Sequence, residues 1–96
     1  MSRRGKRRYL ICYDIKSPRR LARIARLCTR HAVRLQYSVF EAWLSAAERH
    51  QLQHALMALI DPAQDDIRIY GLSDTAELIL LGRAPLMDDV LWSPAL

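Results

Sequence analysis

The stretch Tyr9-Leu-Ile-Cys-Tyr-Asp-Ile15 decides the fold of this 96-residue chain. It is short, rich in aromatic and β-branched residues, and apolar on both alternating sets of side chains, a pattern typical of a buried strand. Ser17 and Pro18 follow, and they are the residue types preferred at a helix N-cap and in a first helical turn. We therefore expect a buried strand over 9–15 that leads directly into a helix.

The helix predicted from Pro18 to Arg30 has one apolar and one basic face. Its apolar residues are spaced i, i+3, i+4 and i+7, and its arginines fall on the opposite side, as 100° per residue requires. The apolar set is Leu21, Ile24, Ala25 and Cys28, and the basic set is Arg19, Arg23, Arg26 and Arg30.

Residues 34–44 are extended, but eleven residues are long for one strand, so we expect a bend or tight hairpin near Tyr37-Ser38. Ser45-Ala-Ala-Glu48 has the pattern of a capping box and opens a second helix, which ends at Asp61-Pro62. The apolar stripe of this second helix consists of Leu52, Ala55, Leu56, Leu59 and Ile60.

Two further strands are predicted, over 66–72 and 77–81, which gives the order β-α-β(β)-α-β-β with both helices on one sheet face. A basic arm at 1–8 and a tail at 84–96 flank the domain at 9–83. Strands 9–15 and 77–81 are apolar on both faces, and two helices can cover only one face. We expect a second copy of the chain to pack on the other face.

The composition is that of a globular, basic protein. Hydrophobic residues make up 51% of the chain and charged residues 26%; the net charge is +5, and thirteen of the fifteen basic residues are arginine. The planar fork of arginine suits phosphate oxygens, so a nucleic-acid partner is indicated, although many basic proteins bind none. No apolar stretch approaches the ~20 residues that span a bilayer, and no signal core follows the basic start. We expect a cytoplasmic protein in which Cys12 and Cys28 are reduced and buried.

Asp14 ends the first strand, beside the basic helix. A carboxylate at a strand end can hold a hard cation such as Mg²⁺, which often takes one or two protein carboxylates and completes its shell with water or phosphate. The alternative is a carboxylate that stabilises the N-terminus of the helix at 18–30. The spacing alone leaves both interpretations open.

The arginine face of the first helix is interpreted as a phosphate-binding surface, and the alternative is an ordinary solvated face. Mixed lysine and glutamate would be usual on a solvated face, whereas Asp14 is the only acid near these arginines in the sequence. Arg20 of the same helix and Arg7 and Arg8 of the basic arm are further candidate nucleic-acid ligands. His50 and His54 have the spacing of helical zinc ligands, but Gln51 stands where a zinc peptidase has its general base, so zinc is not predicted. Ser38 has no evident His/Asp partners for nucleophilic catalysis.

Three segments together carry a resemblance to a known family: Tyr9 to Ile15, Arg34-Leu-Gln-Tyr-Ser-Val-Phe-Glu41 and Ile67-Arg-Ile-Tyr-Gly-Leu72. With the basic helix between the first two, the chain resembles the Cas two family of CRISPR adaptation proteins over residues 8–83. The resemblance implies an α+β, ferredoxin-like β-α-β-β-α-β domain with an antiparallel sheet. It also implies a homodimer formed through the open sheet face, often with a C-terminal strand laid on the partner.

The resemblance also implies roles for individual residues. Asp14 matches the aspartate proposed as a metal ligand shared across the dimer. Arg34 and Phe40 match positions implicated in nuclease activity, and the weaker carry-overs are Tyr13, Arg20, Arg23 and Ser38.

Two functions are described for the family: Mg²⁺-dependent cleavage of RNA or DNA, and a non-catalytic bridge that holds duplex DNA between dimers of the CRISPR integrase. A related toxin family keeps an RNA-cleaving interpretation open. Cleavage at a two-metal site gathers several acidic ligands, whereas a clamp needs only distributed arginines. The sequence offers one convincing carboxylate and many arginines, so we predict the bridging role and regard hydrolysis as the alternative.

Overall fold

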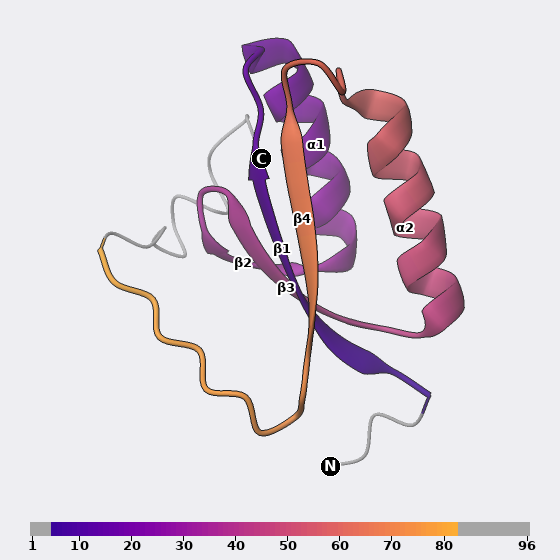
Figure 1. Cartoon of the computed structure of the whole chain (residues 1–96), viewed down its shortest axis with the longest axis vertical. Helices are drawn as coiled ribbons and strands as arrows, with labels where there is room; N and C mark the ends of the chain where they lie inside the picture. The colour runs from indigo at the N-terminus through magenta and orange to yellow at the C-terminus, as the bar shows by residue number, and fades with distance from the viewer. Residues whose placement is uncertain (1–4, 83–96) are drawn as a thin grey trace.

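The computed structural model describes residues 5–82 and shows a four-stranded antiparallel sheet with both helices on one face (Figure 1). The strand order is β2-β3-β1-β4, and every neighbouring pair is antiparallel. The elements are β1 (Arg7–Asp14), α1 (Pro18–His31), β2 (Val33–Gln36), β3 (Val39–Leu44), α2 (Ala46–Leu59) and β4 (Asp66–Leu72). This order confirms the predicted α+β, ferredoxin-like arrangement. The extended stretch at 34–44 is split into β2 and β3 around Tyr37-Ser38, as predicted.

The helix starts follow the predicted capping chemistry. The Ser17 hydroxyl accepts a hydrogen bond from the Arg20 backbone N–H at 3.3 Å, and Pro18 opens α1. At α2 both halves of the capping box are present: the Ser45 side chain accepts from the Glu48 N–H, and the Glu48 carboxylate accepts from the Ser45 N–H. This backbone hydrogen bond from Ser45 lowers the pKa of Glu48.

The core lies between the helices and the facing side of the sheet. Its largest fully buried side chains are Phe40, Ile11, Ile24 and Cys28. Cys12 and Cys28 are both free, and burial raises the pKa of the Cys28 thiol to about 12, so this thiol packs as a small hydrophobic group. Cys12 lies on the opposite face of the sheet and is only half-buried.

The apolar face of α1 is narrower than predicted. Ile24, Ala25 and Cys28 are buried, but Leu21 is 40% exposed. Leu21 belongs to the predicted apolar set, but it lies one turn before the buried residues and stays partly exposed.

The predicted strand at 77–81 is not a strand in the part of the chain that the structure describes. Two side chains tether this segment: Arg8 Nη1 donates to the Ala76 carbonyl at 2.8 Å, and Gln36 Nε2 donates to the Leu81 carbonyl at 3.1 Å. Between these tethers the chain swings away from the sheet (Figure 1), and Ile79 is 70% exposed. This segment pairs with neither edge strand of the described sheet, β2 or β4, so no ladder of backbone hydrogen bonds holds it as a strand. The tail at 84–96 lies outside the described residues.

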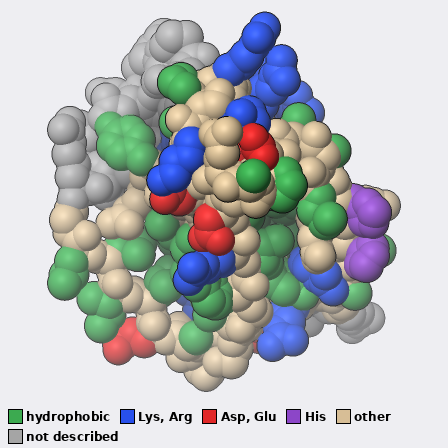
Figure 2. Space-filling model, turned by 45° about the horizontal axis from the view of Figure 1, so that its top comes forward, with side chains coloured by type: hydrophobic (Ala, Val, Ile, Leu, Met, Phe, Trp, Pro, Cys, Tyr) green, Lys and Arg blue, Asp and Glu red, His purple; other side chains and the backbone are tan. Residues whose placement is uncertain are grey.

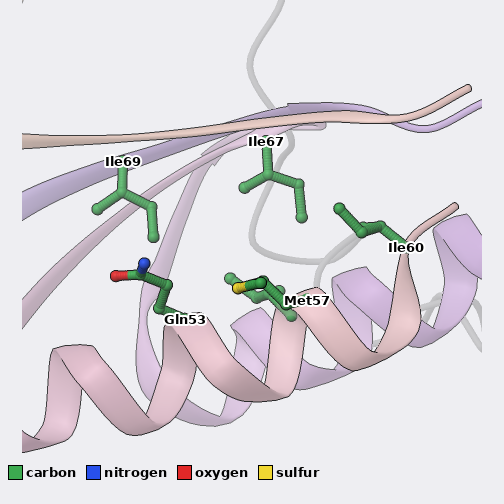
Figure 3. A pocket seen from close by; sticks show the side chains of 6 residues that line it. Gln53, Met57, Ile60, Ile67 and Ile69 are labelled. Atoms are coloured by element: carbon green, nitrogen blue, oxygen red, sulfur yellow. The ribbon is translucent and has the colours of Figure 1, made fainter. Parts of the chain in front are cut away.

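Two apolar surfaces remain uncovered in the described chain. One is the sheet face away from the helices, which carries Leu10, Cys12, Val39, Trp43 and Tyr70 in alternating positions. The other is a groove of about 320 Å³ beside β4, whose outer edge pairs with no described strand (Figure 3). Gln53, Leu56, Met57, Ile60, Ile67 and Ile69 line this groove.

Candidate nucleic-acid and metal sites

The outward face of α1 is a row of exposed arginines. Arg19, Arg23, Arg26 and Arg30 are all solvent-exposed, and none of them has an ion-pair partner among residues 5–82. A helical rise of 1.5 Å per residue spreads the four side chains over about 16 Å. We call these four residues the α1 arginine row. Figure 2 shows blue side chains gathered at the upper edge of the molecule.

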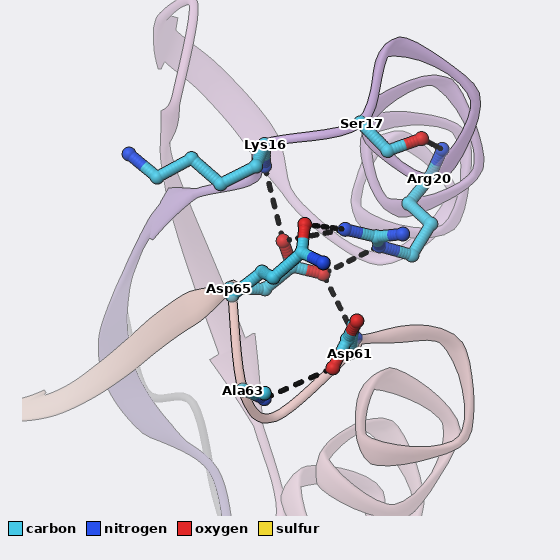
Figure 4. Close-up of polar contacts among 7 residues, drawn as sticks. Lys16, Ser17, Arg20, Asp61, Ala63 and Asp65 are labelled. Carbon is cyan, nitrogen blue, oxygen red and sulfur yellow. Dashed lines mark hydrogen bonds and ion pairs between the residues drawn. The ribbon is translucent and has the colours of Figure 1, made fainter.

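The Arg20 side chain forms an ion pair with Asp65. Its Nε donates to Asp65 Oδ2 at 2.6 Å and its Nη2 to Asp65 Oδ1 at 3.1 Å. The enclosed Asp65 carboxylate also accepts from the backbone N–H groups of Lys16 and Asp61 (Figure 4). These donors, Arg20 first, hold the pKa of Asp65 well below its usual range. The structure therefore gives Arg20, a predicted nucleic-acid ligand, a place in a clamp that joins α1 to the loop before β4.

The two arginines of the predicted arm that the structure places belong to β1. Arg8 is paired with Glu41 of β3 and bonded to the Ala76 carbonyl, so its guanidinium is already occupied. Arg7 remains exposed, with its side chain alongside Gly71 of β4. Arg7 is the more exposed of the two, and both stay predicted nucleic-acid ligands.

Asp14 lies at the exposed end of β1, with its carboxylate 3.1 Å from Lys16 Nζ. It is the direct cross-strand partner of Asp66, whose carboxylate lies 3.0 Å from Arg68 Nε. Directly opposed residues project from the same sheet face, so the two carboxylates share one surface. Their oxygen donors suit Mg²⁺, which tolerates two carboxylates and several waters. Within residues 5–82, no group of three or more His, Cys, Asp or Glu side chains could hold a metal ion.

Arg34 and Phe40 lie on the other face of the sheet from Asp14. They are cross-strand partners, and Phe40 is also paired with Ile11 in the core. The Arg34 guanidinium lies 5.1 Å from the centre of the Phe40 ring, and its Nη2 donates to the Tyr37 carbonyl at 2.9 Å. Its Nε and Nη1 are buried and have no partner among the described residues. The structure thus does not bring Asp14, Arg34 and Phe40 together within one chain.

Tyr13 and Arg34 donate hydrogen bonds to carbonyl groups of the turn between β2 and β3. The Tyr13 hydroxyl donates to the Tyr37 carbonyl at 3.2 Å, and the Tyr13 N–H donates to the Ser38 carbonyl at 3.1 Å. Burial raises the pKa of the Tyr13 hydroxyl, which therefore stays protonated and keeps its donor role. Tyr13, Arg34 and Ser38 form one structural assembly around the turn.

The model of the family described as "CRISPR associated protein Cas2" matches residues 7–77, which is most of the chain. The chain belongs to the Cas2 family. The "CRISPR-associated endoribonuclease Cas2 1" of Nitrosomonas europaea is 41% identical over 88% of this chain and 81% of its own length. The "CRISPR-associated endonuclease Cas2 2" of Thermus thermophilus is 34% identical over 90% of this chain and 96% of its own.

Solved structures share the fold. A crystal structure of Streptococcus pyogenes Cas2 matches with a TM-score of 0.68 at 32% identity, covering 75% of this chain and 98% of that one. A hypothetical protein of Thermus thermophilus matches with a TM-score of 0.76 at 35% identity, covering 85% and 98%. These matches confirm the family and the Cas2 fold predicted from sequence. No helix within residues 5–82 has the length and apolar character needed to cross a membrane.

Proposed function

We propose that this Cas2-family chain is a CRISPR adaptation subunit that binds duplex nucleic acid through the α1 arginine row, forms a homodimer and bridges the CRISPR integrase. The observation that carries the proposal is the row itself: four exposed arginines on one helix face with no described carboxylate beside them. An ordinary solvated face would carry charges of both signs.

The spacing of the row suits a phosphate backbone. Successive members are one helical turn apart, so each guanidinium can reach a different phosphate along one strand. Arginine forks bind phosphate oxygens in pairs, which positions a duplex without reading its bases. Arg7 adds a further exposed cation at the other end of β1.

A second copy of the chain is the proposed cover for the open sheet face. Leu10, Cys12 and Val39 form an apolar strip across β1 and β3 that neither helix covers. The exposed segment 77–81 and the unpaired edge of β4 are further surfaces that the same partner would bury. A domain of this size buries by itself only about 60–65% of the surface that its unfolded chain exposes, so burial of these surfaces in a dimer would add to its stability.

Duplex binding by arginine variants tests the proposal. Replacement of Arg19, Arg23, Arg26 and Arg30 by Gln, singly and together, should weaken binding in steps. If each arginine contacts one phosphate, replacing all four should also reduce the magnitude of the slope of log K against log salt by about 3–4 per chain. Arg49→Gln on α2, where Arg49 is bonded to Gln53, is the matched control and should leave the slope unchanged. An unaltered affinity and slope in the four-fold variant would refute the proposal.

A second candidate function is Mg²⁺-dependent cleavage of RNA or DNA, or a toxin-like ribonuclease activity. It is favoured by the Asp14–Asp66 cross-strand pair and by the names endoribonuclease and endonuclease that its relatives carry. Asp14 and Asp66 would hold the cation, which would neutralise charge on the scissile phosphate. If a dimer brought two such pairs together, the cation could be shared.

Cleavage assays at equal purity distinguish this function from the bridging role. Wild-type protein and Asp14→Asn should be compared with Mg²⁺ and with EDTA. Loss of activity only in Asp14→Asn supports the nuclease, whereas equal residual activity in both identifies a contaminant. Duplex affinity in the same samples should not depend on Asp14.

A further inference from the structure

His50 and His54 form a pair on the outer surface of α2. Their ring centroids are 5.6 Å apart, and both residues are exposed. Figure 2 shows paired histidine side chains side by side on the surface. The proposed function assigns no role to this pair, which lies on α2 while the arginine row lies on α1 and Asp14 lies at the end of β1.

The separation of the two rings is close to that of a metal chelate. With metal–nitrogen bonds of about 2.0–2.1 Å, each ring centroid lies about 3.2 Å from the ion, so the centroids lie about 5.2 Å apart at the tetrahedral angle of Zn²⁺ and about 4.5 Å apart at the 90° angle of tetragonal Ni²⁺ or Cu²⁺. Rotations about the side-chain bonds would close the difference of about 0.4–1.1 Å from the observed separation and turn one nitrogen of each ring toward a common ion. The backbone positions of the pair therefore suit binding of one ion through both imidazoles.

The helix itself holds the pair in place. Both residues are interior to α2 (Ala46–Leu59), and the helix N-terminus is fixed by the complete capping box. Residues at i and i+4 face the same way, with Cβ atoms about 5–6 Å apart. A rigid backbone lowers the entropy that two ligands lose when they bind one ion, because only their side-chain rotamers remain to be fixed.

We propose that His50 and His54 form a two-ligand site for a divalent transition metal of the Ni²⁺, Cu²⁺ or Zn²⁺ class. Imidazole nitrogen favours these ions, whereas Mg²⁺ prefers oxygen donors. No third protein ligand joins the pair within residues 5–82, so water fills the remaining coordination positions. The pair would thus bind a different class of ion from the Mg²⁺ proposed for Asp14 and Asp66.

Calorimetric titration of untagged, full-length protein with NiCl₂ tests the site. Wild-type protein should bind one ion per chain, and His50→Gln or His54→Gln should lower the affinity at least tenfold. His31→Gln, at the exposed end of α1, is the matched control and should bind like wild type. Cys12→Ser should also bind like wild type, which separates the imidazole pair from the half-buried thiol.

Three results would overturn the proposal: no binding by wild-type protein, equal affinity in the His50 and His54 variants, or loss of binding in Cys12→Ser. Excess MgCl₂ should not displace the bound Ni²⁺, and displacement would likewise contradict a nitrogen site. The substituted histidines are exposed, so circular dichroism of each variant should match the wild-type spectrum. The test does not depend on nuclease activity or on duplex binding.

Discussion

Replacement of Phe40 by Ala should damage the fold before it damages any chemistry. Phe40 is fully buried and stacks on Tyr13 with ring centroids 6.0 Å apart, while the Arg34 guanidinium covers its ring. Removal of a buried aromatic ring costs about 3–5 kcal/mol through lost transfer energy and the cavity left behind. A domain of this size has about 5–15 kcal/mol of stability in total, and each kcal/mol moves the melting temperature by about 4–8 °C. We expect a fall of more than about 10 °C.

The assay is thermal and urea unfolding at one fixed protein concentration, because self-association would shift the apparent stability. Phe40→Leu is the control: it keeps most of the apolar volume and should cost about 1.5 kcal/mol or less. Cleavage by the folded fraction is measured in parallel. A Phe40→Ala protein that melts like wild type but has lost nuclease activity would refute the structural assignment and place Phe40 at the substrate.

Three further predictions follow from the described contacts. Asp65→Asn should destabilise the protein at neutral pH and reduce the loss of unfolding free energy in acid. The reason is that a carboxylate with a depressed pKa contributes stability that is lost as the pH falls below about 4. Unfolding free energies measured from pH 7 to pH 2 check this. Asp14→Asn should change the unfolding free energy by no more than about 1 kcal/mol, since its pair with Lys16 is exposed; a larger change in urea unfolding would give Asp14 a structural role. Leu10→Arg places a cation opposite Glu41 on the open sheet face, where it should prevent a second copy from packing, so sedimentation should show a folded monomer. A variant that still forms a dimer would show that the interface lies on another surface.

Local chemistry made the helices and their ends predictable from sequence. The caps at Ser17 and Ser45 and the turn near Tyr37-Ser38 depend on neighbours within a few residues, and the structure confirms each of them. The family resemblance, which rested on three separated segments, is also confirmed.

Long-range pairings could not be predicted in the same way. Asp65 is 45 residues from Arg20, and nothing local distinguishes it from an ordinary turn carboxylate. The register that sets Asp14 opposite Asp66 depends on how β4 docks against β1. The inward position of Arg34 depends on the register of β2 against β3, which shifts between Arg34 and Gln36. Nothing in the sequence around Arg34 indicates that its side chain lies against Phe40 and Tyr37.

The α1 arginine row has a consequence for handling the protein. It contains three like-charged pairs at i,i+3 or i,i+4 spacing, each of which destabilises a helix by about 0.2–0.5 kcal/mol. Added salt screens this self-repulsion, so moderate salt should raise the melting temperature of the nucleic-acid-free protein. If the row binds nucleic acid as proposed, RNA and DNA in a cell lysate should bind to it strongly at low salt, because binding releases their counterions. Protein purified without a high-salt wash is therefore expected to carry RNA or DNA fragments that make it more heat-resistant than the clean protein.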